Sequence, residues 1–127
     1  MDGISVEIRP VPKPRMTGKS AIYSDTAKRY YSWKDELNLL VGNFRCGHEL
    51  SLVFTMPMPK SWSKAKRAAM DTTPHQQKPD IDNLIKAVLD ALYEDDSCVW
   101  NISAAKFWGT EGQIQIINLV NVDAQEV

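Results

Sequence analysis

The spacing of hydrophobic residues along the chain predicts four strands. Residues 3–9 alternate between apolar and polar side chains, which is typical of a half-buried strand. Residues 50–57 are almost continuously apolar and end at a proline, which indicates a deeply buried strand. Residues 98–108 and 113–120 also have strand character, and the short GTEG segment between them predicts a hairpin.

Apolar residues at helical spacing predict three helices. They span residues 25–41, a short segment at 61–70, and residues 82–93, whose apolar surface is broad enough to be mostly buried. Each predicted helix starts at a residue that can accept hydrogen bonds from the first turn. These N-cap candidates are Ser24 or Asp25, Ser61, and Asp82. Gly42 is the predicted end of the first helix.

The order of these elements is strand, helix, strand, helix, helix, strand, strand. This order predicts an α/β fold with a small mixed β-sheet packed with helices. A chain of 127 residues is long enough to bury one hydrophobic core, and no linker or repeat divides it. We therefore expect a single domain over residues 1–127. The sequence has no glycine-rich phosphate loop, which argues against a nucleotide-binding doubly wound fold.

Charged residues are distributed unevenly, although the formal net charge is only −1. Basic residues dominate two segments, residues 13–34 and 60–67, while acidic residues gather at 90–96. Such segregation is typical of a solvated face, but it also fits a basic rim around an acidic centre. The candidates for contacts with DNA phosphates are Lys13, Arg15, Lys19, Lys60, Lys64, Lys66 and Arg67.

The segment KPDIDNLIKAVLDAL, residues 78–92, combines acidic and basic residues at the start of the third predicted helix. Asp80 and Asp82 could both contact one Mg²⁺ ion, which proteins hold through a few carboxylates plus water. Lys86 lies one helical turn after Asp82. There its ammonium could bind a phosphate or stabilise the charge of a transition state.

A third carboxylate is available in the pair Asp95 and Asp96, which precedes a predicted strand. Each of these features also has a structural explanation. Asp82 can act purely as an N-cap, the acidic pair as an ordinary turn, and Lys86 as the exposed edge of a helix. The functional interpretation gains weight because the features occur together and beside the basic segments.

The same segment, followed shortly by a DD pair before a strand, closely resembles the signature of the RusA-type Holliday junction resolvases, a family of endodeoxyribonucleases. The resemblance covers essentially the whole chain. The proline-rich N-terminal loop, the segment FTMPMPKSWSKAKRAAM and Lys106 in the following strand also match. The resemblance implies a homodimer that binds a four-way DNA junction and makes paired nicks in opposing strands. It also implies Mg²⁺ as the cofactor, with Mn²⁺ as a substitute.

The resemblance further assigns roles to individual residues. The implied metal ligands and catalytic residues are Asp80, Asp82 and Asp96, with Lys86 as the essential lysine. The implied supporting residues are Asn83, Asp95 and Lys106. Only Tyr93 and Glu94 separate DAL from DD, a shorter segment than the family pattern has. This leaves open whether Asp95 or Asp96 is the third ligand.

Two alternatives to an active nuclease stay open from the sequence. The shortened segment before the acidic pair suits a module that binds branched DNA with lost or reduced cleavage. The other alternative is a small structural or partner-binding domain, in which the acids only cap and solvate. The N-terminus lacks a signal-peptide pattern and no apolar run approaches about 20 residues, so we expect a cytoplasmic protein without a membrane partner.

Overall fold

The computed structural model describes residues 2–15 and 24–122, in which four strands form one mixed sheet. The strands are β1 Gly3–Val6, β2 Glu49–Pro57, β3 Asn101–Gly109 and β4 Gln113–Asn118. Their order across the sheet is β1-β4-β2-β3. β2 and β3 run parallel, whereas β4 runs antiparallel to both β1 and β2. The predicted α/β class with a small mixed sheet is confirmed.

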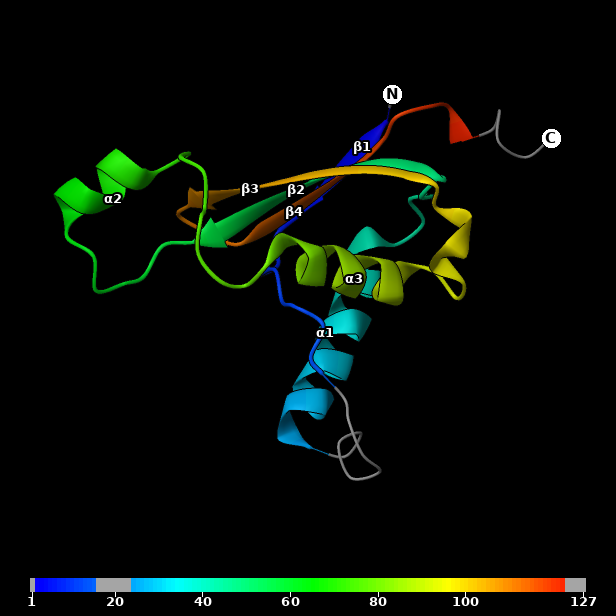
Figure 1. Ribbon diagram of the computed structural model, residues 1–127, viewed down its shortest axis with the longest axis horizontal. Coiled ribbons are helices and arrows are strands. Elements are labelled where there is room, and N and C mark those ends of the chain that lie inside the picture. Colours follow the sequence, from blue (N-terminus) through cyan, green and yellow to red (C-terminus); the bar gives the residue numbers. More distant parts are fainter. Residues whose placement is uncertain (1, 16–23, 123–127) are drawn as a thin grey trace.

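Three α-helices accompany the sheet in the described residues. They are α1 Asp25–Val41, α2 Lys64–Met70 and α3 Ile81–Leu92, and a short 3₁₀ helix, η2 Asp96–Cys98, follows α3. Figure 1 shows α1 and α3 on the same side of the sheet, with α2 projecting beyond one end of it. β2 and β3 can be parallel because the chain crosses over between them through α2 and α3. None of the helices in these residues is both long and apolar enough to cross a membrane.

β3 and β4 do not form the predicted hairpin. β2 lies between them and pairs with both, so the short connection from Gly109 to Gln113 passes across the end of β2. A short segment rich in turn residues predicts that the chain reverses, but not which strand lies next in the sheet. Gly109 is buried, and a Cβ atom there would clash with the side chain of Thr55 on β2. The glycine therefore permits the close crossing.

The starts of two helices differ from the predicted ones. Ser63, not Ser61, caps α2, and its hydroxyl accepts a hydrogen bond from the backbone N–H of Lys66 at 3.1 Å. Asp80, not Asp82, occupies the N-cap position of α3. Both shifts arise because the backbones of Ser63 and Asp80 are extended, and an N-cap residue is the last one outside helical geometry.

β1 is shorter than predicted and ends at Val6 instead of residue 9. Beyond it the chain runs toward α1, where the carbonyl of Arg9 accepts a hydrogen bond from the Trp33 indole at 2.8 Å. Ile8 is nevertheless buried. The alternating pattern of this segment therefore reports burial correctly, while strand pairing stops earlier.

The hydrophobic core lies between the sheet and the helices α1 and α3. The buried residues of α3 are Leu84, Ala87 and Val88. The sheet contributes the buried side chains of Leu50, Leu52, Phe54, Ile114 and Ile116. Burying one such aliphatic side chain contributes about 1.5–3 kcal/mol. These contacts fix the rotation of α3 about its axis, so that its polar residues are presented away from the core.

Candidate functional site

The N-terminal loop, described over residues 7–15, and the start of α3 enclose an open cleft of about 720 Å³. The residues that line it are Lys13, Pro14 and Arg15 from the loop, and Asp80, Asp82, Asn83 and Lys86 from α3 and its cap. The loop is fastened to the helix by a hydrogen bond from the Lys13 N–H to the Asn83 carbonyl at 3.1 Å. The cleft therefore brings together two acidic and three basic residues of the set predicted from the sequence.

Neither carboxylate in the cleft is used as a helix cap. Asp80 occupies the N-cap position, yet its side chain accepts no capping hydrogen bond. Its carbonyl accepts a hydrogen bond from the Leu84 N–H at 3.3 Å, which starts the helix. The side chain of Asp82, in the first turn, is 65% exposed. Both carboxylates are therefore available to a ligand that enters the cleft.

Lys86 lies beside Asp82 on the exposed face of α3. Its ammonium is 3.7 Å from an Asp82 carboxylate oxygen, and its side chain is 63% exposed. An exposed pair at this helical spacing contributes only about 0.3–0.5 kcal/mol. The lysine can therefore exchange its carboxylate partner for a phosphate oxygen at small energetic cost.

Lys106, on β3, holds the chain just before Asp80. Its ammonium donates to the carbonyls of Gln77 and Pro79, the latter at 2.7 Å. Because Pro79 directly precedes Asp80, these bonds fasten the turn that carries the first carboxylate into the cleft. This geometry suits a residue that positions the site without contacting the substrate.

Asp95 and Asp96 lie at the opposite end of α3. The Asp95 carboxylate accepts a hydrogen bond from the Ser97 N–H at 3.0 Å, and hydrogen bonding to Ser97 holds the pKa of Asp95 below its usual value. Asp96 is exposed. α3 has 12 residues and therefore separates the acidic pair from Asp80 and Asp82 by about 18 Å along its axis. Nowhere in residues 2–15 and 24–122 are three His, Cys, Asp or Glu side chains grouped so that they could hold a metal ion. A single chain thus does not bring the three predicted carboxylates together.

The second basic segment forms a projection that we call the α2 arm, residues 58–70 (Figure 1). Its exposed lysines are Lys60, Lys64 and Lys66. The Lys66 ammonium lies 4.3 Å from the centroid of the Trp62 ring. Arg67 is instead half-buried, and its guanidinium donates to the Pro59 carbonyl at 2.9 Å. The lysines of the arm are thus exposed to a partner, while Arg67 shapes the arm itself.

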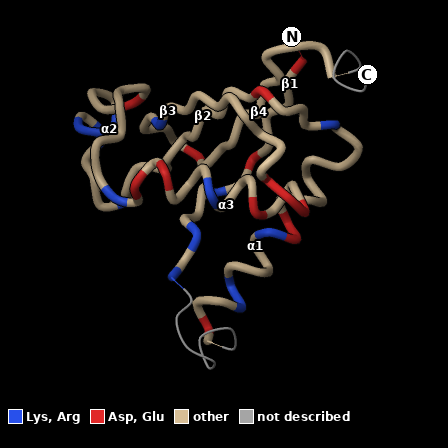
Figure 2. The backbone as a smooth tube through the Cα atoms, turned by 45° about the vertical axis from the view of Figure 1, so that its right-hand side comes forward, with Lys and Arg blue, Asp and Glu red and all other residues tan. Residues whose placement is uncertain are grey.

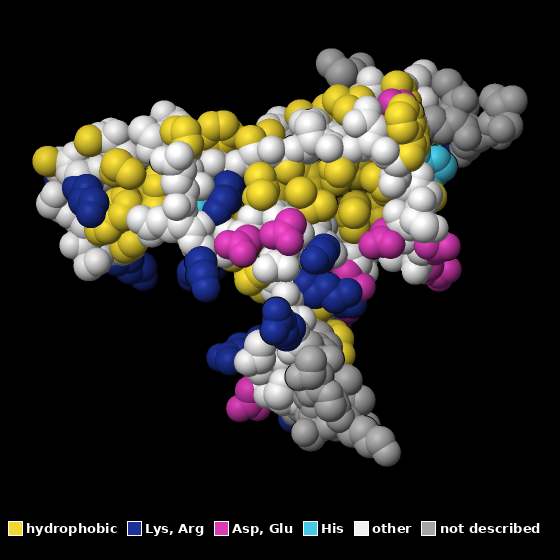
Figure 3. All heavy atoms as spheres, in the orientation of Figure 1, with side chains coloured by type: hydrophobic (Ala, Val, Ile, Leu, Met, Phe, Trp, Pro, Cys, Tyr) yellow, Lys and Arg dark blue, Asp and Glu magenta, His cyan; other side chains and the backbone are white. Residues whose placement is uncertain are grey.

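Basic side chains flank the acidic ones on the surface that carries the cleft. Figure 3 shows acidic side chains between two groups of basic ones, one toward the α2 arm and one near the crossing of α1 and α3. Figure 2 places Lys and Arg on the same segments of the backbone. This distribution agrees with the expected basic rim around an acidic centre. Lys19 lies outside the described residues.

Comparison with known proteins assigns the chain to a family. Residues 7–117 match the family described as Endodeoxyribonuclease RusA. The chain belongs to this family. A curated relative, the uncharacterized protein YqaN of Bacillus subtilis (strain 168), is 38% identical over 69 residues, which cover 48% of this chain and 49% of the relative. The chain therefore spans about half the length of the curated relative it matches. The RusA resemblance found in the sequence is confirmed, and the cleft lies within the matched residues.

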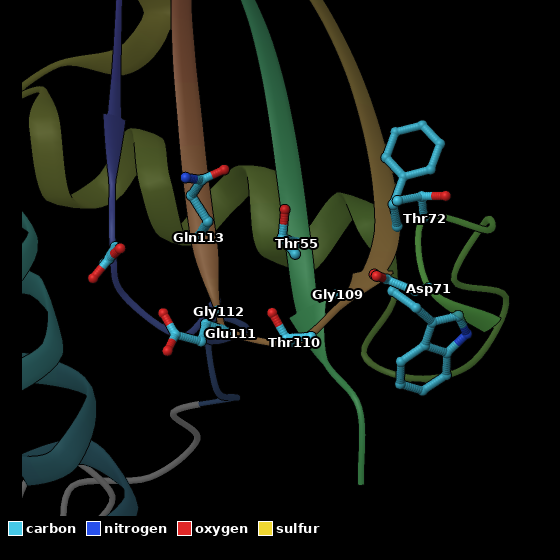
Figure 4. A pocket seen from close by; sticks show the side chains of 11 residues that line it. Thr55, Asp71, Thr72, Gly109, Thr110, Glu111, Gly112 and Gln113 are labelled. Atoms are coloured by element: carbon cyan, nitrogen blue, oxygen red, sulfur yellow. The ribbon is translucent and has the colours of Figure 1, made fainter. Parts of the chain in front are cut away.

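A second hollow of the RusA-family chain, of about 550 Å³, lies at the end of the sheet (Figure 4). It is bounded by β2, β3 and the turn that crosses the end of β2. Its lining includes Glu7, Asp71 and Glu111 but no Lys or Arg. Negative charge without basic neighbours repels a phosphate backbone. The cleft at the start of α3 is therefore the candidate site for a nucleic acid.

One residue of α3 has a larger role than the sequence indicates. Asp90 accepts hydrogen bonds from the Tyr30 hydroxyl at 2.7 Å and the Lys34 ammonium at 3.1 Å, and it pairs with Lys13 at 3.6 Å. In the sequence, Asp90 is only one member of a polar stripe on the helix, with Asn83 and Lys86 at helical spacing before it. No local pattern could have revealed these contacts, because its partners are far away in the chain.

Proposed function

We propose that this RusA-family protein is a metal-dependent endodeoxyribonuclease that resolves Holliday junctions by paired nicks in opposing strands. One observation carries the proposal. The carboxylates of Asp80 and Asp82, which are not used to cap the helix, share a cleft with the basic side chains of Lys13, Arg15 and Lys86. Carboxylates suit a divalent cation, and the basic side chains suit the phosphates of a DNA strand. Membership of the RusA family supports the same chemistry.

Asp80 and Asp82 are suited to hold Mg²⁺. Mn²⁺ would substitute for it, because both ions bind oxygen ligands. In sites that process phosphates, Mg²⁺ is bound through one or two carboxylates, and water and phosphate oxygens complete the shell. Two carboxylates in an open cleft, of which Asp82 is paired only with the exposed side chain of Lys86 in the described residues, fit this requirement. When bound, the ion would polarise the scissile phosphate and lower the pKa of a water molecule.

The remaining side chains of the cleft would orient the DNA strand and offset its charge. Lys86 would move from Asp82 to a phosphate oxygen and stabilise the negative charge that develops in the transition state. Lys13 and Arg15, on the opposite wall, would bind neighbouring phosphates without reading sequence. Asn83 would support this wall, because its carbonyl accepts the hydrogen bond from the Lys13 N–H.

We propose further that the protein acts as a homodimer, because a four-way junction offers two equivalent strands to a twofold protein. A twofold axis that sets two α3 helices antiparallel would bring the partner subunit's Asp96 toward the cleft of Asp80 and Asp82. Apolar side chains are exposed between β3 and α3 in Figure 3. Partly buried apolar residues of these two elements are Ile85, Leu89, Ile102 and Ala104. Such a surface suits the contact between two copies.

A module that binds branched DNA with lost or reduced cleavage is the second candidate function. It is favoured by the observation that the described part of one chain contains no group of three carboxylates able to hold a metal ion. The exposed lysines of the α2 arm suit contacts with DNA in either case. Cleavage, not binding, therefore decides between the two candidates.

The test is a nicking assay on a synthetic four-way junction, with and without Mg²⁺ or Mn²⁺. Wild type, Asp82→Asn and the control Asp35→Asn are compared; Asp35 is an exposed acid on α1 that does not line the cleft. We expect metal-dependent paired nicks from wild type and from Asp35→Asn. The rate for Asp82→Asn should fall by at least about 100-fold, because the residue is proposed to hold the ion that stabilises transition-state charge.

Binding to the same junction is measured by gel shift in the absence of metal. The nuclease proposal fails if wild type makes no metal-dependent nick, or if Asp82→Asn nicks at the wild-type rate. Tight junction binding without products in either metal would identify the branched-DNA-binding module.

A further inference from the structure

Three donors from two other segments converge on the Asp90 carboxylate. The Tyr30 hydroxyl and the Lys34 ammonium, both on α1, donate to it at 2.7 Å and 3.1 Å. The Lys13 ammonium, from the N-terminal loop, lies 3.6 Å from its other oxygen. One carboxylate of α3 thus joins the loop, α1 and α3. Asp90 does not line the cleft.

The side of this cluster that belongs to α1 is closely packed. Tyr30 is only 2% exposed, and its ring stacks on Trp33 with centroids 6.1 Å apart. Burial, followed by the hydrogen bond to Asp90, raises the pKa of Tyr30, so its hydroxyl stays a donor. The Lys34 ammonium also lies 5.3 Å from the centroid of the Tyr30 ring. Asp90 is therefore held in place from the α1 side.

Lys13 is fastened to α3 at two points. Its backbone N–H donates to the Asn83 carbonyl at 3.1 Å, and its ammonium meets Asp90. Asn83 and Asp90 are about two helical turns apart. Lys13 therefore lies along α3 between Asn83 and Asp90. This position directs the next two residues, Pro14 and Arg15, along the cleft.

We propose that Asp90 is a positioning residue that, through Lys13, holds the N-terminal loop in place as the second wall of the cleft. The inference rests on the proposed function, because the position of this wall matters only if the cleft binds DNA. Asp90 acts without touching the substrate. It also offsets the repulsion between the ammonium groups of Lys13 and Lys34.

The positioning role and the charge of Asp90 predict opposite effects on DNA binding when Asp90 is replaced. Replacing a carboxylate near a DNA-binding cleft by a neutral amide removes a repulsion and should tighten binding. Loss of positioning should weaken binding, because Lys13 and Arg15 must then be ordered when the DNA arrives. The direction of the change in affinity therefore separates the two explanations.

The first experiment needs no DNA and no metal. Hydrogen exchange of the Lys13 amide is followed by NMR in wild type, Asp90→Asn, Lys13→Met and the control Asp35→Asn. We expect the amide of residue 13 to exchange at least about threefold faster in Asp90→Asn and in Lys13→Met than in wild type. Each of these variants loses the ion pair between residues 13 and 90. Exchange in Asp35→Asn should equal that of wild type. Equal exchange in all four proteins would overturn the proposal, and Lys13→Met keeps it testable if Asp90→Asn does not fold.

The second experiment measures affinity for a four-way junction without divalent metal. Asp90→Asn should bind at least about threefold more weakly than wild type, although it carries one negative charge less, whereas Asp35→Asn should bind no more weakly. In the Lys13→Met background, where the positioning contact is already lost, Asp90→Asn should not weaken binding further. Equal or tighter binding by Asp90→Asn would overturn the positioning role. Absence of junction binding by wild type would instead overturn the proposed function, and the exchange result would stand.

Discussion

Asp82 and Asp90 lie about two turns apart on the same helix, yet their surroundings differ. Asp82 is 65% exposed and pairs with Lys86, its neighbour on the same helix, at 3.7 Å. Asp90 is 32% exposed and receives donors from α1 and from the N-terminal loop. The comparison separates two uses of one residue type. Where donors converge, a carboxylate joins segments of the fold, and where they do not, it is available to a ligand.

The backbone explains why donors from distant segments reach Asp90 but not Asp82. At the start of α3, the loop makes its contact through a backbone hydrogen bond to the Asn83 carbonyl, which leaves the neighbouring carboxylates uncovered. Near the end of the helix, α1 packs closely enough for the Tyr30 hydroxyl to reach Asp90 directly. The tertiary contact, and not the helix pattern, therefore decides the role of each acid.

The largest expected difference between the two acids is in the response of stability to metal. At Mn²⁺ a hundredfold above its Kd, the free energy of unfolding should rise by about 2.7 kcal/mol for wild type and Asp90→Asn, because an ion that binds only the folded state stabilises it. Asp80→Asn and Asp82→Asn should show little of this increase. Urea unfolding with Mn²⁺ or with a chelator measures both effects.

The chelated samples provide the control. Without metal, Asp90→Asn should be less stable than wild type by about 1 kcal/mol, because the donors of Tyr30 and Lys34 lose a charged acceptor. Asp82→Asn should stay within about 0.5 kcal/mol of wild type. The assignment of roles would be contradicted by the reverse pattern, in which Asp90→Asn is no longer stabilised by Mn²⁺ and Asp82→Asn is less stable than wild type without metal.

A smaller effect is expected from Lys106, which fastens the turn before Asp80 as Asp90 fastens the loop. Lys106→Met keeps the length of the side chain but removes its bonds to the carbonyls of Gln77 and Pro79. The rate of junction cleavage at saturating enzyme should fall by about tenfold, because the carboxylate loses its fixed position. Single-turnover kinetics with Mg²⁺ measure this rate.

A matched control for that experiment is Lys64→Met, which removes an exposed ammonium from the α2 arm. This change should weaken binding and reduce its salt dependence while leaving the saturated rate unchanged. A wild-type rate for Lys106→Met would show that the turn keeps its place without these hydrogen bonds.

Local sequence patterns were sufficient to predict the helices and strands and to group Asp80, Asp82 and Lys86. The helix periods predicted α1 and α3 within about two residues, because burial against one core imposes that period. Asp80, Asp82 and Lys86 could be grouped in advance, since one turn of helix and its cap bring them together. Contacts of this kind depend only on short separations along the chain.

Features that depend on distant segments could not be predicted. The hairpin prediction failed because β2, far away in sequence, inserts between β3 and β4. Asp96 is near Asp82 in sequence, but the full length of α3 separates them in space. The three partners of Asp90 come from two remote segments. Each case requires the tertiary arrangement.

The smallest expected effect is a dependence of stability on acid pH through Asp90. Burial by itself raises the pKa of this carboxyl, but hydrogen bonds from Tyr30 and Lys34, with the charges of Lys34 and Lys13, outweigh it and hold the pKa below its usual value. An unfolded chain protonates Asp at about pH 3.9, so it takes up this proton at a higher pH than the folded protein does. The stabilisation is therefore complete above about pH 5 and is lost as the pH falls through the folded pKa.

Urea unfolding of wild type, Asp90→Asn and Tyr30→Phe from neutral to acid pH measures this loss. The gap in unfolding free energy between wild type and Asp90→Asn should be constant above about pH 5 and should close below it; its size is at most about 1 kcal/mol, because solvent screens a carboxyl that is a third exposed. Tyr30→Phe removes one donor, so its own gap to Asp90→Asn should be smaller and should close at a higher pH. A gap that persists unchanged into acid would mean that these donors do not hold the Asp90 carboxylate in solution, and the contrast with Asp82 would then have no physical basis.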